Sequence, residues 1–192
     1  MKKKQPTRRE HQRASLITTL ADYVLSVGLS ETSLRQLADA GGVSNRMLLY
    51  YFEDKSEIIR LVLMQIAAEL AQKLGSTLTD DAPQSPRDAF LILAKLAQGK
   101  ELRPHMMVWV EAAAAASRGQ EPFTEIAAAI SKSFIVWMEE RLSTPDPKER
   151  KADAAMILAM VDGLTVLSTC VPASQVRSAQ NKMAATLKGD GE

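Results

Sequence analysis

Apolar side chains recur along this chain at intervals of three and four residues, which is the spacing of one face of an α-helix. The clearest stripe lies near the N-terminus and comprises Ile17, Leu20, Ala21, Val24 and Val27. Strict alternation of apolar and polar residues, which is typical of half-buried strands, is nearly absent. The pattern therefore predicts an all-α fold.

Helix-capping residues mark where the helices begin. Thr7, Ser33 and Asp54 are each followed three residues later by Glu or Gln, as in a capping box or its Asp variant. Ser85 and Asp146 each precede a proline, which suits the first position of a helix. With Gly- and Pro-containing segments as breaks, the chain divides into about nine predicted helices. Their expected ranges are 7–27, 33–40, 44–51, 55–75, 86–99, 104–117, 121–142, 147–170 and 173–188.

The segment GGVSNRMLLYYFEDKSE begins at Gly41 and follows a short predicted helix. Its glycine pair supplies the backbone freedom of a tight turn, because glycine adopts positive φ without steric cost. Ser44 is placed to cap the helix that follows. This arrangement predicts a helix-turn-helix over residues 33–52, in which the first turn of the second helix reaches base edges in the major groove. The residues of that turn are Asn45, Arg46 and Met47.

The large side chains that end the second helix have two expected roles. Leu48 and Phe52 lie four residues apart and share one face, so they are expected to pack on the neighbouring helices. Tyr50 and Tyr51 can present a ring to the protein and a hydroxyl to a DNA phosphate. Lys55 begins the next helix, where its ammonium can meet the same phosphate backbone.

Composition bounds the class of protein. With 192 residues, of which 46% are hydrophobic, the chain can bury a core without metal or disulfides. Cys170 is the only cysteine, which excludes an intrachain disulfide and fits a reducing cytoplasm. No apolar segment directly follows the basic N-terminus, so no secretory signal is expected. The longest apolar run, residues 154–171, is interrupted by Asp162 and Gly163 and predicts a buried helix rather than a membrane span.

The formal net charge of +1 conceals an asymmetry between the two parts of the chain. Residues 1–55 carry nine Lys and Arg against six Asp and Glu, whereas the remainder carries fifteen against seventeen. A basic excess at one end is typical of a domain that faces nucleic acid.

The segment TSLRQLADAGGVSNRMLLYYFEDKSEII resembles the DNA-binding signature of the TetR (tetracycline-repressor-like) bacterial transcriptional regulators. The positions that match the family pattern are Thr32, Gly42, Val43, Ser44, Leu48, Phe52, Lys55 and Ile58. Leu49 departs from it, because the family usually has a phosphate-binding tyrosine there. The resemblance therefore assigns the phosphate role to Tyr51 first and to Tyr50 second. The residues expected to bind DNA are Arg8, Arg9, Thr32, Ser44, Asn45, Arg46, Met47, Tyr50, Tyr51 and Lys55.

The resemblance also implies the domain organisation. Residues 1–55 would form a three-helix helix-turn-helix domain, and residues 56–192 a helical-bundle body that binds an effector and dimerises. The last two predicted helices would pair with their copies in a second chain. A dimer suits DNA recognition, because two recognition helices about 34–36 Å apart read both halves of a palindrome. The Asp-Gly-Leu at 162–164 is similar to one that is common in the family's eighth helix.

The family usually holds a small-molecule pocket inside its body. The candidate lining residues are Phe90, His105, Trp109, Phe134, Trp137 and Met138, and core packing is the alternative interpretation of each. Asp162 lies in an apolar helix, where an unpaired carboxyl is costly to bury. It is expected to be a structural or interface hydrogen-bonding group rather than a ligand-binding one.

The sequence thus predicts a DNA-binding transcriptional regulator and not an enzyme. There is no Gly-rich phosphate loop, no metal-ligand cluster, and no nucleophile beside a histidine motif, so neither a cofactor nor a metal is expected. The regulator would act as a dimeric repressor that is released from a palindromic operator by a small, mainly apolar effector. The alternative is a DNA-binding dimer or adaptor whose body binds a protein partner and no small ligand.

Overall fold

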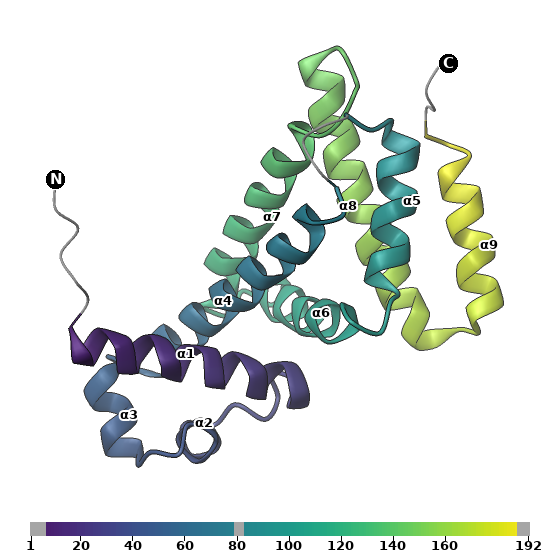
Figure 1. Ribbon diagram of the computed structural model, residues 1–192. Coiled ribbons are helices and arrows are strands. Elements are labelled where there is room, and N and C mark those ends of the chain that lie inside the picture. The colour runs from purple at the N-terminus through teal and green to yellow at the C-terminus, as the bar shows by residue number, and fades with distance from the viewer. Residues whose placement is uncertain (1–6, 79–82, 188–192) are drawn as a thin grey trace, which may run out of the picture.

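A computed structural model describes residues 7–78 and 83–187, and within these ranges the chain forms nine α-helices (Figure 1). They are α1 Arg8–Val27, α2 Leu34–Ala40, α3 Asn45–Tyr51, α4 Lys55–Gly75, α5 Pro86–Ala97, α6 Arg103–Ser117, α7 Phe123–Glu139, α8 Pro147–Cys170 and α9 Ala173–Ala184. The described residues contain no strand, only an isolated bridge between Gln84 and Leu142. The predicted all-α fold is confirmed.

The predicted capping residues begin the helices as expected. Thr7 and Ser33 each form a complete capping box, with Glu10 and Gln36 as their partners. The Asp54 carboxylate accepts a hydrogen bond from the Glu57 backbone N–H at 2.7 Å. These caps satisfy N–H groups that the first helical turn leaves without a partner inside the helix.

Three helices end earlier than the sequence predicts. The segment after α7 leaves helical geometry because Gln84 pairs with it: the Gln84 N–H donates to the Arg141 carbonyl, and the Ser143 N–H donates to the Gln84 carbonyl, each at 2.8 Å. Helix α5 ends at Ala97 and α9 at Ala184, and a turn follows each. Residue 188, the predicted end of the last helix, lies outside the described residues.

Helices α1, α2 and α3 form a small unit at one end of the molecule, here called the head (Figure 1). Its core is a cluster of buried side chains to which the first half of α4 also contributes. Leu20, Leu37, Leu48 and Ile58 come from the four helices in turn, and each is fully buried. At roughly 1.5–3 kcal/mol for each large aliphatic side chain buried, this cluster stabilises the packing of the head's three helices against α4.

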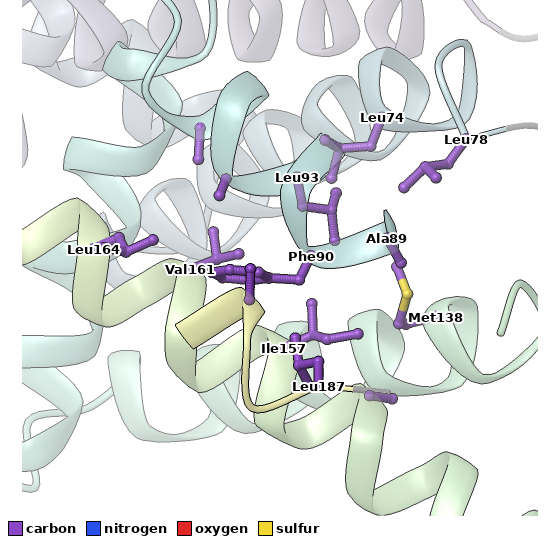
Figure 2. Close-up of a cluster of buried hydrophobic side chains, with 14 of the residues drawn as sticks. Leu74, Leu78, Ala89, Phe90, Leu93, Met138, Ile157, Val161, Leu164 and Leu187 are labelled. Atoms are coloured by element: carbon purple, nitrogen blue, oxygen red, sulfur yellow. The ribbon is translucent and has the colours of Figure 1, made fainter. Parts of the chain in front are cut away.

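Helices α5 to α9 form the larger unit, here called the body, which is built around a second cluster. Figure 2 shows Phe90 and Leu93 of α5 beside Ile157 and Val161 of α8 in this cluster. Helix α4 runs from the head into the body, and its last turns add Leu74 to the body's core. One continuous helix therefore belongs to both cores. The domain boundary predicted after residue 55 stays a prediction.

Helix α6 also contacts the head. Val108 and Ala112 of α6 are buried in the head's cluster. The Glu111 carboxylate of α6 accepts a hydrogen bond from the backbone N–H of Leu29, in the turn after α1, at 2.7 Å. The orientation of the head is thus fixed by packing and by one charge-assisted hydrogen bond.

Among the described helices, α8 alone is long and apolar enough to cross a membrane by length and composition. Core helices of soluble proteins meet the same criterion. Helix α8 packs against α5, α6, α7 and α9.

Candidate nucleic-acid interface and body cavity

The turn between α2 and α3 has the geometry of a helix-turn-helix. Gly42 has a φ of 64°, in the left-handed region that favours glycine, whereas the preceding Gly41 has ordinary helical angles. The Val43 N–H donates to the Ala38 carbonyl at 3.0 Å, which closes the turn. The Ser44 hydroxyl then accepts from the Met47 N–H at 3.1 Å and caps α3. The turn thereby sets the direction of α3.

Helix α3 separates an inner face from an outer face. Leu48 and the following Phe52 are 0% and 2% exposed and anchor the helix in the head's core, as their spacing predicts. The outer face is exposed and presents Asn45, Arg46, Met47, Leu49 and Tyr50. A guanidinium, an amide and a thioether therefore lie together on the first turn of the second helix of the motif.

Helix α1 holds the far end of α3 through two arginines. The Arg9 guanidinium donates to the Tyr50 carbonyl at 2.9 Å and lies 4.9 Å from the centre of the Tyr50 ring. The Arg13 guanidinium donates to the Tyr51 carbonyl at 3.2 Å and also pairs with the Glu57 carboxylate. These donors satisfy the last carbonyls of α3 and suit the negative end of its dipole.

Sequence reasoning missed Arg13, although its spacing of four from Arg9 places both on one face of α1. The Tyr51 hydroxyl, which was predicted to bind phosphate, donates to the Gln12 side chain at 2.6 Å. That hydroxyl can still accept a hydrogen bond, but it has no free proton to donate to a phosphate in this conformation. The exposed Tyr50 hydroxyl is the freer of the two.

The remaining predicted DNA-binding residues fall into two groups. Arg8 at the start of α1 and Lys55 at the start of α4 are exposed, and both are separate from the first turn of α3. Thr32 is only 4% exposed, and its hydroxyl donates to the Leu29 carbonyl at 2.6 Å. Thr32 therefore stabilises the turn that precedes α2 and presents no hydroxyl to DNA.

The body contains an apolar cavity, partly open to the surface, between α4, α5, α6, α7 and α8. Of the predicted pocket residues, Trp109 and Phe134 line it. Phe90 and Met138 are 0% exposed and belong to the packed core, as the core-packing alternative predicts. Trp137 lies outside the cavity, in a surface groove between α4 and α7, with the Arg141 guanidinium 4.4 Å from its ring centre.

The cavity's remaining walls come from residues that the sequence did not single out, including Leu70, Leu93, Met106 and Leu158. Asp162 also lines it. The space open to the centre of a water-sized sphere is about 60 Å³, which corresponds to roughly four to six water molecules.

His105 is buried beside the cavity rather than in its lining. It is 5% exposed, and neither ring nitrogen has a hydrogen-bond partner. Burial lowers the pKa of His105, and the nearby Lys73 lowers it further, against the opposing effect of Glu69. The ring is therefore neutral at pH 7, so its 3.9 Å approach to the Glu69 carboxylate is not an ion pair.

Among the described residues, no group of three His, Cys, Asp or Glu side chains is arranged to hold a metal ion.

The sequence is similar to those of known helix-turn-helix regulators. The HTH-type transcriptional regulator BetI of Ectopseudomonas mendocina is 27% identical over 102 residues, which are 52% of this chain and 52% of that protein. BetI of Yersinia pestis is 29% identical over 91 residues, 47% of this chain and 44% of that protein. The chain thus matches only about half the length of these curated relatives. No protein-family model matches it.

Solved structures share the fold over nearly the whole chain. A transcriptional regulator from Rhodococcus has a TM-score of 0.71 at 23% identity, covering 91% of this chain and 95% of its own. A TetR-family regulator from Cytophaga hutchinsonii has 0.75 at 14% identity, covering 96% and 98%. The multidrug binding protein EbrR, complexed with imidazole, has 0.68 at 18% identity, covering 98% and 97%. The predicted resemblance is confirmed, and the fold is that of TetR-family transcriptional regulators.

Proposed function

We propose that this chain, with the fold of TetR-family regulators, is a cytoplasmic DNA-binding transcriptional repressor whose body responds to a small effector. The observation that carries the proposal is the exposed first turn of α3, with Asn45, Arg46 and Met47 presented on a helix whose other face is buried. A helix held in this way can enter a major groove without losing its own packing. The similarity to helix-turn-helix regulators supports the same role.

The chemistry of the outer face suits both kinds of DNA contact. An arginine can bind the O6 and N7 atoms of guanine with two hydrogen bonds, and an asparagine can bind adenine in the same manner. Arg8 and Lys55 lie to either side in the chain and supply charge for phosphates, which fixes position without reading sequence. Arg46 and Asn45 are therefore the specificity residues, and Arg8 and Lys55 the affinity residues.

The dimer that palindrome recognition requires would form through α8 and α9. Helix α8 carries an exposed stripe of small or apolar residues at alternating spacings of four and three. The stripe comprises Ala152, Met156, Ala159, Gly163, Val166 and Cys170. Apolar residues at this spacing suit a second helix packed along the same face.

The dimer is tested by changing one residue of the stripe. Val166→Glu places a charge where two copies of α8 would meet, and sedimentation is expected to show a monomer that remains helical. Val136→Glu on α7 is the matched control, because Val136 is 49% exposed and Val166 47%. A dimer that survives Val166→Glu, or that Val136→Glu alone disrupts, would move the interface away from α8.

The effector would bind in the cavity and act on the head through two helices. Helix α4 contributes Leu70 and Leu74 to the cavity and the buried Ile58 to the head's core. Helix α6 contributes Trp109 to the cavity and, two residues later, Glu111 to the hydrogen bond with the turn after α1. A ligand that displaces either helix changes how the head is held. A coupling of about 1–3 kcal/mol would loosen operator binding roughly 5- to 150-fold.

The proposed function is tested by selecting bound fragments from random duplex DNA with the full chain. The expected result is enrichment of a palindrome whose half-sites lie about one helical turn apart. Affinity for the enriched site should greatly exceed affinity for random DNA at the same salt concentration. Absence of enrichment would contradict sequence-specific DNA binding.

The effector's action is tested by titrating a cavity ligand with and without the enriched duplex. Linkage requires that operator DNA weaken ligand binding by the factor by which the ligand weakens operator binding. Equal ligand affinities in the two titrations would exclude the switch and would favour the adaptor whose body binds a protein partner.

A further inference from the structure

One ion pair lies where α1, α3 and α4 meet. The Arg13 guanidinium of α1 pairs with the Glu57 carboxylate of α4. Its Nε also donates to the carbonyl of Tyr51, the last residue of α3, at 3.2 Å. The same guanidinium lies 5.1 Å from the centre of the Phe52 ring. A single side chain thus contacts the end of α3 and the start of α4 at once.

The Glu57 carboxylate has partners on both of its oxygens. Its Oε1 pairs with Arg13, and its Oε2 accepts a hydrogen bond from the Glu53 backbone N–H, in the turn between α3 and α4, at 2.6 Å. Glu57 also lies in the first turn of α4, where a negative charge suits the positive end of the helix dipole. Arg13 suits the negative end of α3 in the same way. The dipoles of both helices therefore reinforce the pair.

This pair is less exposed than a second ion pair that α4 makes. The side chains of Arg13 and Glu57 are 36% and 22% exposed. Those of Arg60 and Glu125, which pair between α4 and α7 at 3.4 Å, are 45% and 68% exposed. Partial burial and further hydrogen bonds to both charged groups make an ion pair stronger than an exposed one. The Arg13–Glu57 pair is therefore suited to hold helix ends in place.

Helix α3 is short and is anchored in the core by few side chains. It has seven residues, of which Leu48 is buried, and the buried Phe52 follows directly. Two anchors on one face restrain the tilt of such a helix weakly, because neither holds its backbone. Arg13 bonds the backbone itself, at the Tyr51 carbonyl. Arg9 bonds the neighbouring carbonyl, but from an exposed position. The angle of α3 thus depends on the contacts at its far end.

We propose that Arg13 and Glu57 are positioning residues for DNA recognition, and that their ion pair holds α3 at the angle at which its first turn meets base edges. This inference rests on the proposed DNA-binding function and adds to it two residues that contact no base. Recognition groups must be held within about 0.5 Å and 10–20° of the productive geometry. The pair would therefore determine how well the protein distinguishes its operator from random DNA, whereas phosphate contacts made from α1 and α4 would change little.

The test measures discrimination, which is the ratio of affinity for the duplex selected by the wild-type chain to affinity for random duplex at the same salt concentration. Arg13→Gln removes the charge that pairs with Glu57 and the fixed fork of the guanidinium. The ratio should fall by about 5- to 150-fold, the range expected when one bidentate base contact is misaligned. A ratio equal to that of the wild type would overturn the proposal.

Glu57→Gln separates positioning from simple electrostatics. It removes a negative charge from the head, so affinity for random duplex should rise. The ratio should nevertheless fall severalfold, because a neutral amide holds the Arg13 guanidinium less firmly than a carboxylate does. A ratio unchanged in Glu57→Gln would reduce Glu57 to an effect of charge and would overturn its positioning role.

The double variant Arg13→Gln, Glu57→Gln removes the pair and keeps the net charge of the head. Its ratio should be about as low as that of Arg13→Gln alone, since both changes break one interaction. Its salt dependence on random duplex should match the wild type, and a slope reduced by about one unit would make Arg13 a phosphate contact and overturn the proposal. Arg60→Gln is the matched control, because it breaks the pair with Glu125 and should leave the ratio unchanged. An equal loss in Arg60→Gln would also count against the proposal.

A measurement without DNA keeps this inference separate from the proposed function. Amide hydrogen exchange reports local opening, and in Arg13→Gln the segment 45–52 should exchange faster than in the wild type while the body does not. Unchanged exchange in that segment, or faster exchange throughout the chain, would overturn the positioning role. A wild-type chain that selects no duplex would refute the DNA-binding function, and exchange would still decide whether the pair holds α3. A chain that selects a duplex and keeps its ratio in Arg13→Gln loses this inference alone.

Discussion

The substitution Gly28→Ala tests how the head is attached to the body. Gly28 follows α1 with φ 83° and ψ 178°, a region of backbone space that is essentially restricted to glycine. A Cβ atom added there would lie 2.6 Å from the Oε1 atom of Glu111. That carboxylate also accepts the Leu29 N–H, so alanine both strains the backbone and displaces the hydrogen bond between head and body.

The magnitude follows from these two effects. Backbone strain of this kind costs about 1–3 kcal/mol. Displacing a partly buried, charge-assisted hydrogen bond adds about 1–2 kcal/mol. The free energy of unfolding, measured in urea, should therefore fall by about 2–5 kcal/mol. Gly119→Ala is the control, because Gly119 also has a positive φ, at 66°, but a Cβ atom added there would meet nothing within 4 Å. Gly119→Ala should therefore lower the free energy of unfolding by about 1–2 kcal/mol, from backbone strain alone.

A double variant separates the strain from the clash. Glu111→Ala removes both the colliding carboxylate and its hydrogen bond, so Gly28→Ala should cost less in that background than in the wild type. The expected difference is about 1–2 kcal/mol, which a double-mutant cycle resolves. If Gly28→Ala costs no more than Gly119→Ala, or if the two changes are additive, then Glu111 does not constrain the turn and the reasoning is refuted.

Three further predictions concern packing, protonation and charge. Leu48→Ala should lower the free energy of unfolding by about 2–5 kcal/mol, because Leu48 is fully buried. Leu49→Ala is the control: Leu49 is 44% exposed, so its loss should change the free energy of unfolding by less than about 0.5 kcal/mol. Similar losses in the two variants would contradict the assignment of Leu48 to the buried face of α3 and Leu49 to the exposed face. Folding lowers the pKa of His105 from 6.5, so as the pH drops the histidine is protonated in the unfolded chain before it is protonated in the folded one. The free energy of unfolding should therefore fall as the pH drops from about 6.5 through the lowered pKa of the folded state. Urea titrations should show a smaller decline in His105→Gln, and an equal decline would exclude the histidine as its source. Lys55→Ala should reduce the slope of log DNA affinity against log salt concentration by about one unit. Lys132 of α7 is also exposed, and Lys132→Ala should leave the slope unchanged. An unaltered slope in Lys55→Ala would show that Lys55 does not contact phosphate.

Helix positions were predictable from the sequence because local interactions determine them. The side chains of Thr7, Ser33 and Asp54 cap helices within their own first turns, so a few neighbouring residues suffice to locate each start. The end of α7 was less predictable, because a distant residue, Gln84, pairs with the backbone that follows it. Local spacing cannot show such a contact between residues far apart in the sequence.

The head was predictable in more detail than the cavity for the same reason. The residues that expose Arg46 and bury Leu48 lie within one short segment, where helical spacing alone separates the two faces. The cavity is lined from five helices, and spacing along one helix cannot show which residues of another complete the wall. For Phe90 the sequence therefore left a pocket role and core packing open, and the structure places this residue in the packed core.

The central claim, that α3 reads DNA sequence, is tested most directly by measuring two affinities of Arg46→Ala at one salt concentration. Affinity for the duplex selected by the wild-type chain should fall by about 1–3 kcal/mol, and discrimination at one base position should relax. Affinity for random duplex DNA should fall much less, because phosphate contacts dominate there. Equal losses on the selected and the random duplex would contradict the claim, since Arg46 would then touch only the phosphate backbone.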